Sequence, residues 1–159
     1  MDKLEVYTYP SLHQRVLDAL DGAVSPTPHF NEVEDDGTST NEKDTNIMGR
    51  FQCSDQNCSQ PGWGSKIVAI RIRRFDDGSY NAGVYGQRCK RCNKLGVLTV
   101  DEQSYVDRVS FRLKKWAGVY VEEPHYRKRD DRAPHKKELC EGCKRGHCRQ
   151  SLSYSYGYV

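Results

Sequence analysis

The sequence predicts a small α+β fold with an antiparallel β-hairpin or short sheet, one main helix and a short helix near the N-terminus. Three features lead to this prediction. Apolar residues alternate with other residues along 66–75, apolar residues recur at helical spacing between 101 and 116, and three groups of closely spaced cysteines surround these segments. Hydrophobic residues make up only 36% of the chain and charged residues 30%. The apolar core is therefore expected to be thin and to need a further stabilising element.

The β-hairpin is predicted from residue 66 onward. In its first arm, Val68, Ile70 and Ile72 alternate with Ala69, Arg71 and Arg73. Residues 76–78, with the sequence Asp-Asp-Gly, are typical of a hairpin turn. The second arm has an apolar face formed by Tyr80, Ala82 and Val84. We therefore expect two antiparallel strands whose apolar faces point toward the core.

Two helices are predicted. The main helix is expected from Asp101, which can cap it, to about Trp116, with an apolar stripe formed by Tyr105, Val109, Leu113 and Trp116. The short helix is expected over residues 10–21, with Ser11 as its cap and Gly22 as its stop signal. Its apolar stripe consists of Leu12, Val16 and Leu20.

Composition divides the chain into four parts. Residues 1–24 form the N-terminal helical segment, and residues 25–48, rich in Pro, Ser, Thr, Asn and acidic residues, are expected to be an acidic polar linker or long loop. Residues 49–150 hold the cysteines and are expected to form the domain, and 151–159 are a tail.

Charge is distributed unevenly along the chain. Residues 1–49 contain 3 basic and 10 acidic residues, whereas residues 50–159 contain 22 basic and 12 acidic residues and all seven cysteines. No apolar run approaches the roughly 20 residues of a membrane span, and the N-terminus has no secretory signal pattern. We therefore expect an intracellular protein in a reducing compartment, the cytoplasm or the nucleus, with its thiols reduced.

The cysteines have metal-ligand spacing. Cys53 and Cys58 are spaced C-x4-C, Cys89 and Cys92 are spaced C-x2-C, and the last group, Cys140, Cys143 and Cys148, is spaced C-x2-C-x4-C. An odd number suits a complete disulfide set poorly. Seven cysteines and one histidine make two sets of four, which is the number of ligands that a structural zinc ion requires. The sequence therefore predicts two zinc ions as cofactors.

The predicted hairpin suggests how the ligands are grouped. A hairpin brings its ends together, so the first two cysteine pairs are expected to meet at its open end, as in a zinc ribbon. The second set is then local, consisting of His135, Cys140, Cys143 and Cys148, because short loops cost less entropy to close. His147 is the competing candidate for the eighth ligand, and the choice between the two histidines stays open at this point.

Enzymatic alternatives fit less well. The Cys89–Cys92 pair could mark a redox site, but the βαβ context of thioredoxin-like proteins is missing. A catalytic zinc ion keeps an open coordination position, whereas eight protein ligands close both sites. We therefore expect neither catalysis nor a small-molecule substrate. Because structural zinc contributes on the order of 10 kcal/mol, a chelator is expected to unfold residues 49–150.

The cysteine groups and their neighbours resemble a known family. The relevant stretches are Phe51-Gln52-Cys53, Trp63-Gly64-Ser65, Gln87 to Cys92, Pro134-His135, Cys140 to Cys143 and Gly146-His147-Cys148. They resemble the three-CxxC zinc-binding domain of receptor-transporting and zygote-arrest proteins. The resemblance implies that the metal ligands are Cys53, Cys58, Cys89, Cys92, His135, Cys140, Cys143 and Cys148. The first pair departs from the family's C-x2-C spacing, so its turn is expected to be wider.

Two functions follow as hypotheses, with either a protein or RNA as the partner. One is a protein-interaction adaptor in which zinc only stabilises the fold. The alternative is an RNA-binding module, which the resemblance to zygote-arrest proteins implies and the basic balance fits. The candidate nucleic-acid-binding residues are Arg71, Arg73, Arg74, Lys90, Arg91, Lys94, Lys144, Arg145 and Arg149, and Tyr80, Tyr85 and Tyr126 are candidates for base stacking.

Overall fold

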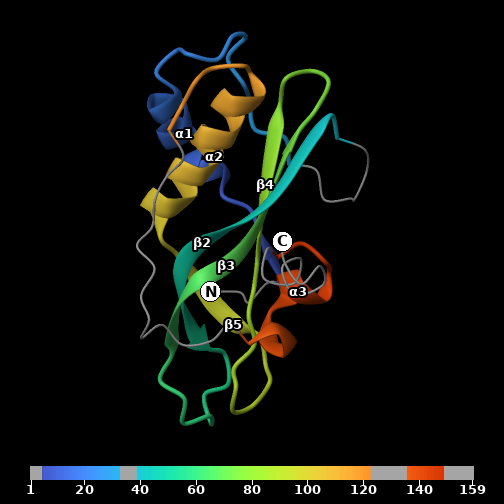
Figure 1. The fold of residues 1–159 in the computed structure, drawn as a ribbon. Helices are drawn as coiled ribbons and strands as arrows, with labels where there is room; N and C mark the ends of the chain where they lie inside the picture. The colour runs from blue at the N-terminus through green and yellow to red at the C-terminus, as the bar shows by residue number, and fades with distance from the viewer. Residues whose placement is uncertain (1–4, 33–38, 123–135, 149–159) are drawn as a thin grey trace.

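A five-stranded antiparallel sheet with helices on both faces forms the fold (Figure 1). The computed structural model describes residues 5–32, 39–122 and 136–148. The strands are β1 (Val6–Tyr7), β2 (Asn41–Cys53), β3 (Trp63–Arg74), β4 (Tyr80–Tyr85) and β5 (Gly96–Val100), in the spatial order β1-β4-β3-β2-β5. The helices are α1 (His13–Leu20), α2 (Glu102–Trp116) and α3 (Glu141–Lys144), with 3-10 turns at Pro10–Leu12 and Lys137–Leu139. This architecture confirms the predicted α+β fold class.

The predicted hairpin is present as β3 and β4. Ile70 lies opposite Val84 and Ile72 opposite Ala82, so the apolar residues of both arms share one face. Gly78 closes the turn with a φ of 85°, a backbone conformation that glycine adopts without steric cost. The hairpin was predictable because both its alternation and its turn are local signals.

Strand β2 corrects the expectation for residues 25–48. The strand begins at Asn41, so residues 41–48 are part of the sheet and not a loop. Its alternation is weak in sequence because the inward positions include a threonine and a glycine: Thr45, Ile47, Gly49 and Phe51 are buried. Acidic and amide side chains occupy the outward positions, where Glu42 pairs with Arg71, Asp44 with His147, and Asn46 donates to Cys148 on the same outer face.

A β-bulge bends the centre of the sheet. Ile47 pairs with Val68 but Gly49 pairs with Ser65, so two residues of β3 lie opposite Met48 alone. Because of the extra residue, odd-numbered residues of β3 face the inner core before the bulge and even-numbered residues face it after the bulge. Trp63 and Val68 therefore pack against the same core.

Both helices that were predicted lie on the inner face of the sheet. Asp101 caps α2 by accepting a hydrogen bond from the backbone N–H of Ser104 at 3.0 Å, as expected. Helix α1 packs on α2 and contributes Val16 and Leu20 to the main core. Ser11 does not cap α1, since the helix continues from a 3-10 turn. The N-terminal helix therefore shares one core with the cysteine-containing part.

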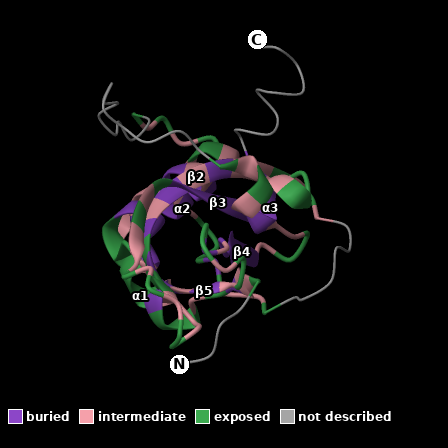
Figure 2. Ribbon diagram, turned by 90° about the horizontal axis from the view of Figure 1, so that it is seen from below, coloured by how far each residue is buried: buried purple, intermediate pink, exposed green. Residues whose placement is uncertain are grey.

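The outer face of the sheet carries a second, smaller core under α3. It is formed by Ile67, Ala69, Tyr85, Cys140 and Cys148. Figure 2 shows the buried residues of β3 between α2 and α3. The sheet is thus covered on both sides at this point, which is why buried residues follow one another without a break from Ile67 to Arg73.

Two arginines are buried on this outer face, although the sequence suggested a charged surface. Arg71 and Arg73 are only 8% and 4% exposed. Arg71 forms an ion pair with Glu42 of β2 at 2.8 Å, and Arg73 donates a hydrogen bond to Asn81 and lies over the Phe75 ring.

None of the helices in the described residues has the length and apolar character needed to span a membrane.

Candidate metal centres

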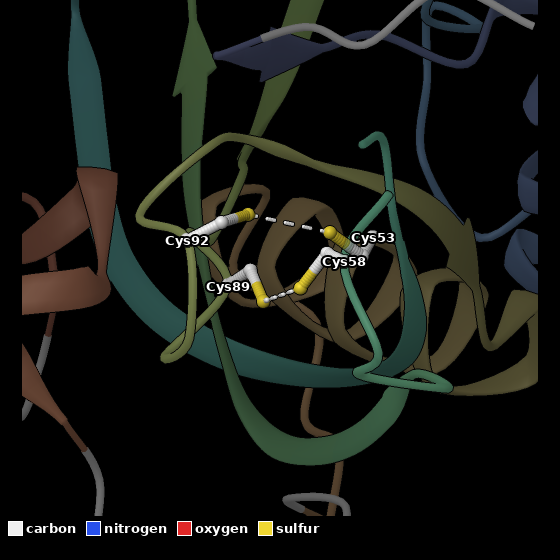
Figure 3. Close-up of side chains that lie close together, drawn as sticks. All are labelled: Cys53, Cys58, Cys89 and Cys92. Atoms are coloured by element: carbon white, nitrogen blue, oxygen red, sulfur yellow. Dashed lines mark hydrogen bonds between the residues drawn. The ribbon is translucent and has the colours of Figure 1, made fainter. Parts of the chain in front are cut away.

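The first cysteine cluster lies where two loops meet at one end of the sheet. Cys53 ends β2 and Cys58 follows it in the loop to β3, while Cys89 and Cys92 lie in the loop from β4 to β5. Because β2 pairs with both β3 and β5, the two loops emerge side by side. All four Sγ atoms lie within 4.8 Å of one another (Figure 3). The sequence-based grouping of these two pairs agrees with this arrangement.

The spacing of the sulfur atoms fits a tetrahedral zinc site. The Sγ atoms of Cys53 and Cys92 are 3.4 Å apart, and those of Cys58 and Cys89 are 3.7 Å apart. Four thiolates with Zn–S bonds of about 2.3 Å in a regular tetrahedron would be separated by about 3.8 Å. The donor set is therefore suited to zinc in both chemistry and size.

Hydrogen bonds hold both loops in the shape that presents the thiols. The backbone N–H of Arg91 donates to Cys89 Sγ at 3.4 Å, and Asn93 closes the turn with a left-handed φ of 63°. In the wider C-x4-C loop, the N–H of Cys58 donates to the carbonyl of Asp55 at 3.0 Å. Lys94 joins the loops through an ion pair with the Asp55 carboxylate at 3.2 Å.

The metal-free thiols differ in acidity. Burial raises the pKa of Cys53 to about 12, and its thiol neighbours act in the same direction. Burial also acts on Cys89, but the backbone N–H groups of Cys92 and Arg91 outweigh it and lower the pKa of Cys89 to about 7. Cys89 therefore becomes an anionic ligand more readily than Cys53, from which a metal ion must displace a proton.

The second cysteine cluster belongs to the short segment on the outer face. Cys140 precedes α3, Cys143 lies within it and Cys148 follows it, and their Sγ atoms lie within 4.8 Å of one another. The N–H of Cys143 donates to Cys140 Sγ at 3.4 Å, and Asn46 of β2 donates to Cys148 Sγ at 3.6 Å. Both bonds favour the thiolate form, which is the form that binds metal, but the neighbouring Cys148 thiol and burial still raise the pKa of Cys140 to about 12.

The two histidine candidates for the fourth ligand have different places. His135 lies outside the described residues. His147 does not join the three sulfur atoms; its Nδ1 lies 3.3 Å from the Asp44 carboxylate, and its ring stacks on Tyr85. The imidazole of His147 thus anchors the segment to β2. Glu42 lies in the same cluster, where the Arg71 guanidinium balances its charge.

Most of the candidate nucleic-acid-binding residues have partners within the fold. Arg74 donates to Asn41 and to the Trp116 carbonyl, and Arg91 donates to Ser59. Lys144 pairs with Glu141 and Arg145 with Glu5. Lys94, Arg71 and Arg73 are engaged as described above, Lys90 is exposed, and Arg149 lies outside the described residues. Of the candidate stacking residues, Tyr80 and Tyr85 are buried and Tyr126 lies outside the described part.

Several residues of these centres were missed by sequence reasoning. Asn46 and Asp44 support the second cluster from positions in β2 that carry no metal-ligand signal in the sequence, and Glu141 supports it from between Cys140 and Cys143. The N–H to sulfur bonds, in contrast, follow from the C-x-x-C spacing itself and could have been inferred.

Comparison with known proteins agrees with this geometry. A family model for a zinc-binding domain, the 3CxxC zinc ribbon, matches residues 46–146, which is more than half of the chain. This range includes all of the first cluster as well as Cys140 and Cys143 of the second. No curated protein and no solved structure gives a significant match. The chain therefore belongs to the 3CxxC zinc-ribbon family of zinc-binding domains, and its two cysteine clusters fit two zinc ions.

Proposed function

We propose that this protein is a non-catalytic adaptor in which two structural zinc ions hold a surface in shape for a protein partner. The proposed ligands of the first ion are Cys53, Cys58, Cys89 and Cys92. Those of the second ion are His135, Cys140, Cys143 and Cys148. The first ion would cross-link the β2–β3 loop to the β4–β5 loop, and the second ion would close the chain segment around α3.

The closed donor set of the first cluster supports a structural role. Four thiols fill all four positions of a tetrahedral site, so no position is left for water or substrate. A catalytic zinc ion needs such a position to activate water or to polarise a carbonyl group. The loops around the first cluster are also pinned by several hydrogen bonds, as a structural cross-link requires.

The internal use of positive charge favours a protein over RNA as the partner. Arginines that are paired inside the fold do not release counterions from a nucleic acid. Buried tyrosines cannot stack on bases. Among the described residues, Tyr120 is the single large hydrophobic side chain that is fully exposed. Most of the candidate basic residues that the structure describes are thus engaged in ion pairs or hydrogen bonds within the fold.

One exposed area is suited to a partner. On the outer face, beside α3, β2, β3 and β5 present what we call the outer strip, formed by Arg50, Gln52, Lys66 and Thr99. Gly64 and Thr99 flank Arg50 in register, and Gly64 leaves its guanidinium uncovered. Neither Arg50 nor Lys66 has an ion-pair partner in the described part of the chain. The strip has two cations and no carboxylate, so it fits an acidic segment of a protein.

Charge reversal in the outer strip tests this proposal. We expect the Arg50→Glu, Lys66→Glu variant to weaken binding of a fluorescent peptide of alternating glutamate and serine by roughly tenfold. The matched control is Lys114→Glu, Lys115→Glu, which changes the charge equally on α2, on the other side of the sheet. This control is expected to bind the peptide like the parent.

A single-stranded RNA of the same net charge separates the two partner classes. The RNA-binding alternative is correct if the parent binds this RNA more tightly than the peptide and if the logarithm of the RNA affinity falls with the logarithm of the salt concentration with a slope of several units. Equal loss of peptide binding in both double variants would also contradict the proposed surface.

A further inference from the structure

The two cysteine clusters are joined by a short backbone bridge. Residues 86–88, which lead from β4 into the first cluster, run antiparallel to residues 139–141, which lead into the second. The N–H of Arg88 donates to the Leu139 carbonyl at 2.8 Å, and the N–H of Glu141 donates to the Gly86 carbonyl at 3.1 Å. One end of this bridge therefore immediately precedes Cys89, and the other immediately follows Cys140.

A buried ion pair reinforces the bridge. Arg88 Nε donates to Glu141 Oε2 at 2.9 Å, and the Glu141 side chain is only 7% exposed. The same arginine donates through Nη1 to the carbonyl of Asn93 at 3.0 Å, in the turn that presents Cys89 and Cys92. A carboxylate so deeply buried depends on its partner, because an unpaired charge in this environment is costly.

We propose that Arg88 and Glu141 are positioning residues that couple metal binding at the two clusters, so that zinc at one site raises the affinity of the other. This inference rests on the proposed function, in which both clusters bind zinc. Zinc at the second cluster fixes the α3 turn and holds Glu141 against Arg88. Arg88 is then held in place to support the Asn93 turn, which sets the spacing of the thiols in the first cluster.

Coupling of this kind is reciprocal, and it can be measured from either end. The first cluster is the better reporter, because a substitution in the second cluster alters the smaller core under α3 and removes no side chain from the main core. The perturbation is Cys143→Ser, which removes one thiol of the second cluster. The readout is alkylation of the first cluster at increasing chelator concentration. For each of Cys53, Cys58 and Cys92, mass spectrometry of its peptide gives the chelator concentration at which half of the molecules are alkylated at that cysteine.

The expected result is a shift that depends on the ion pair. In the parent protein, Cys143→Ser is expected to lower this chelator concentration by at least about fivefold. In the Glu141→Gln background and in the Arg88→Met background, the same change is expected to lower it by about twofold or less. Lys144→Met is the matched control. It removes the other cation on Glu141, 3.3 Å away within α3, and the fivefold shift should persist.

Two outcomes would overturn the inference. One is that Cys143→Ser leaves the first cluster unchanged in the parent. The other is that Cys143→Ser causes a shift of equal size in the parent and in the Glu141→Gln, Arg88→Met and Lys144→Met backgrounds. Cys143→Ser would then act through a general loss of structure, which the helical signal in circular dichroism monitors. Failure of the proposed zinc sites is distinct, because the parent would then carry fewer than two zinc ions by native mass spectrometry.

Discussion

Gly142 shows how closely the second cluster is fitted to the sheet. A Cβ atom added at this position would lie 2.3 Å from the Cβ of Ala69, with Cys148 and Tyr85 also in contact. We expect Gly142→Ala to lower the free energy of unfolding by about 1–3 kcal/mol through overpacking, measured by urea denaturation of the zinc-loaded protein. A glycine is therefore needed at position 142 because no room exists for a Cβ atom, and not because of its backbone conformation.

The double variant Gly142→Ala, Ala69→Gly separates this steric explanation from others. It adds a methyl group at position 142 and removes the opposing one at position 69, so its free energy of unfolding should be higher than that of Gly142→Ala alone. The recovery should be incomplete, because a glycine within a strand is slightly destabilising. Gly64→Ala is the control, because its new Cβ would meet only the mobile end of Arg50. If Gly142→Ala matched this control, the account of the contact between α3 and β3 would be wrong.

At the scale of elements, α1 links the N-terminal segment to the cysteine-containing part. Leu20 is 2% exposed and belongs to the main core between α1 and the sheet. We expect Leu20→Ala to lower the free energy of unfolding by about 2–5 kcal/mol, in one cooperative transition seen both by circular dichroism and by tryptophan fluorescence. Gln14→Ala, on the exposed side of the same helix, should change stability by less than about 0.5 kcal/mol. Two separate transitions would show that α1 does not share this core.

The elements also show which parts of the fold were predictable. Helix α2 and the β3–β4 hairpin follow from local signals, a capping aspartate with helical spacing and an alternating arm with a tight turn. Strand β2 was not predictable, because its polar first half becomes a strand only through pairing with β3. The burial of Arg71 was missed for a related reason: its partner, Glu42, lies in that same unpredicted strand.

At the scale of the whole molecule, the metal centres were more predictable than the surface. Cysteine spacing is a strong signal because zinc restricts both ligand type and ligand number. Surface charge is a weak signal, since composition does not say whether an arginine such as Arg73 is exposed or buried. The core is also less thin than composition suggested, since α1 and β2 both contribute to it.

Zinc quantification by native mass spectrometry tests the central claim most directly, with circular dichroism recorded on the same samples. We predict two zinc ions per 159-residue chain, one in His135→Ala and two in His147→Ala, since the imidazole of His147 lies against Asp44 and not among the sulfur atoms. Excess chelator should remove both ions from the parent, together with its helical and sheet signals. A reduced, purified chain that carries no metal and keeps those signals would contradict the claim that zinc holds this fold together.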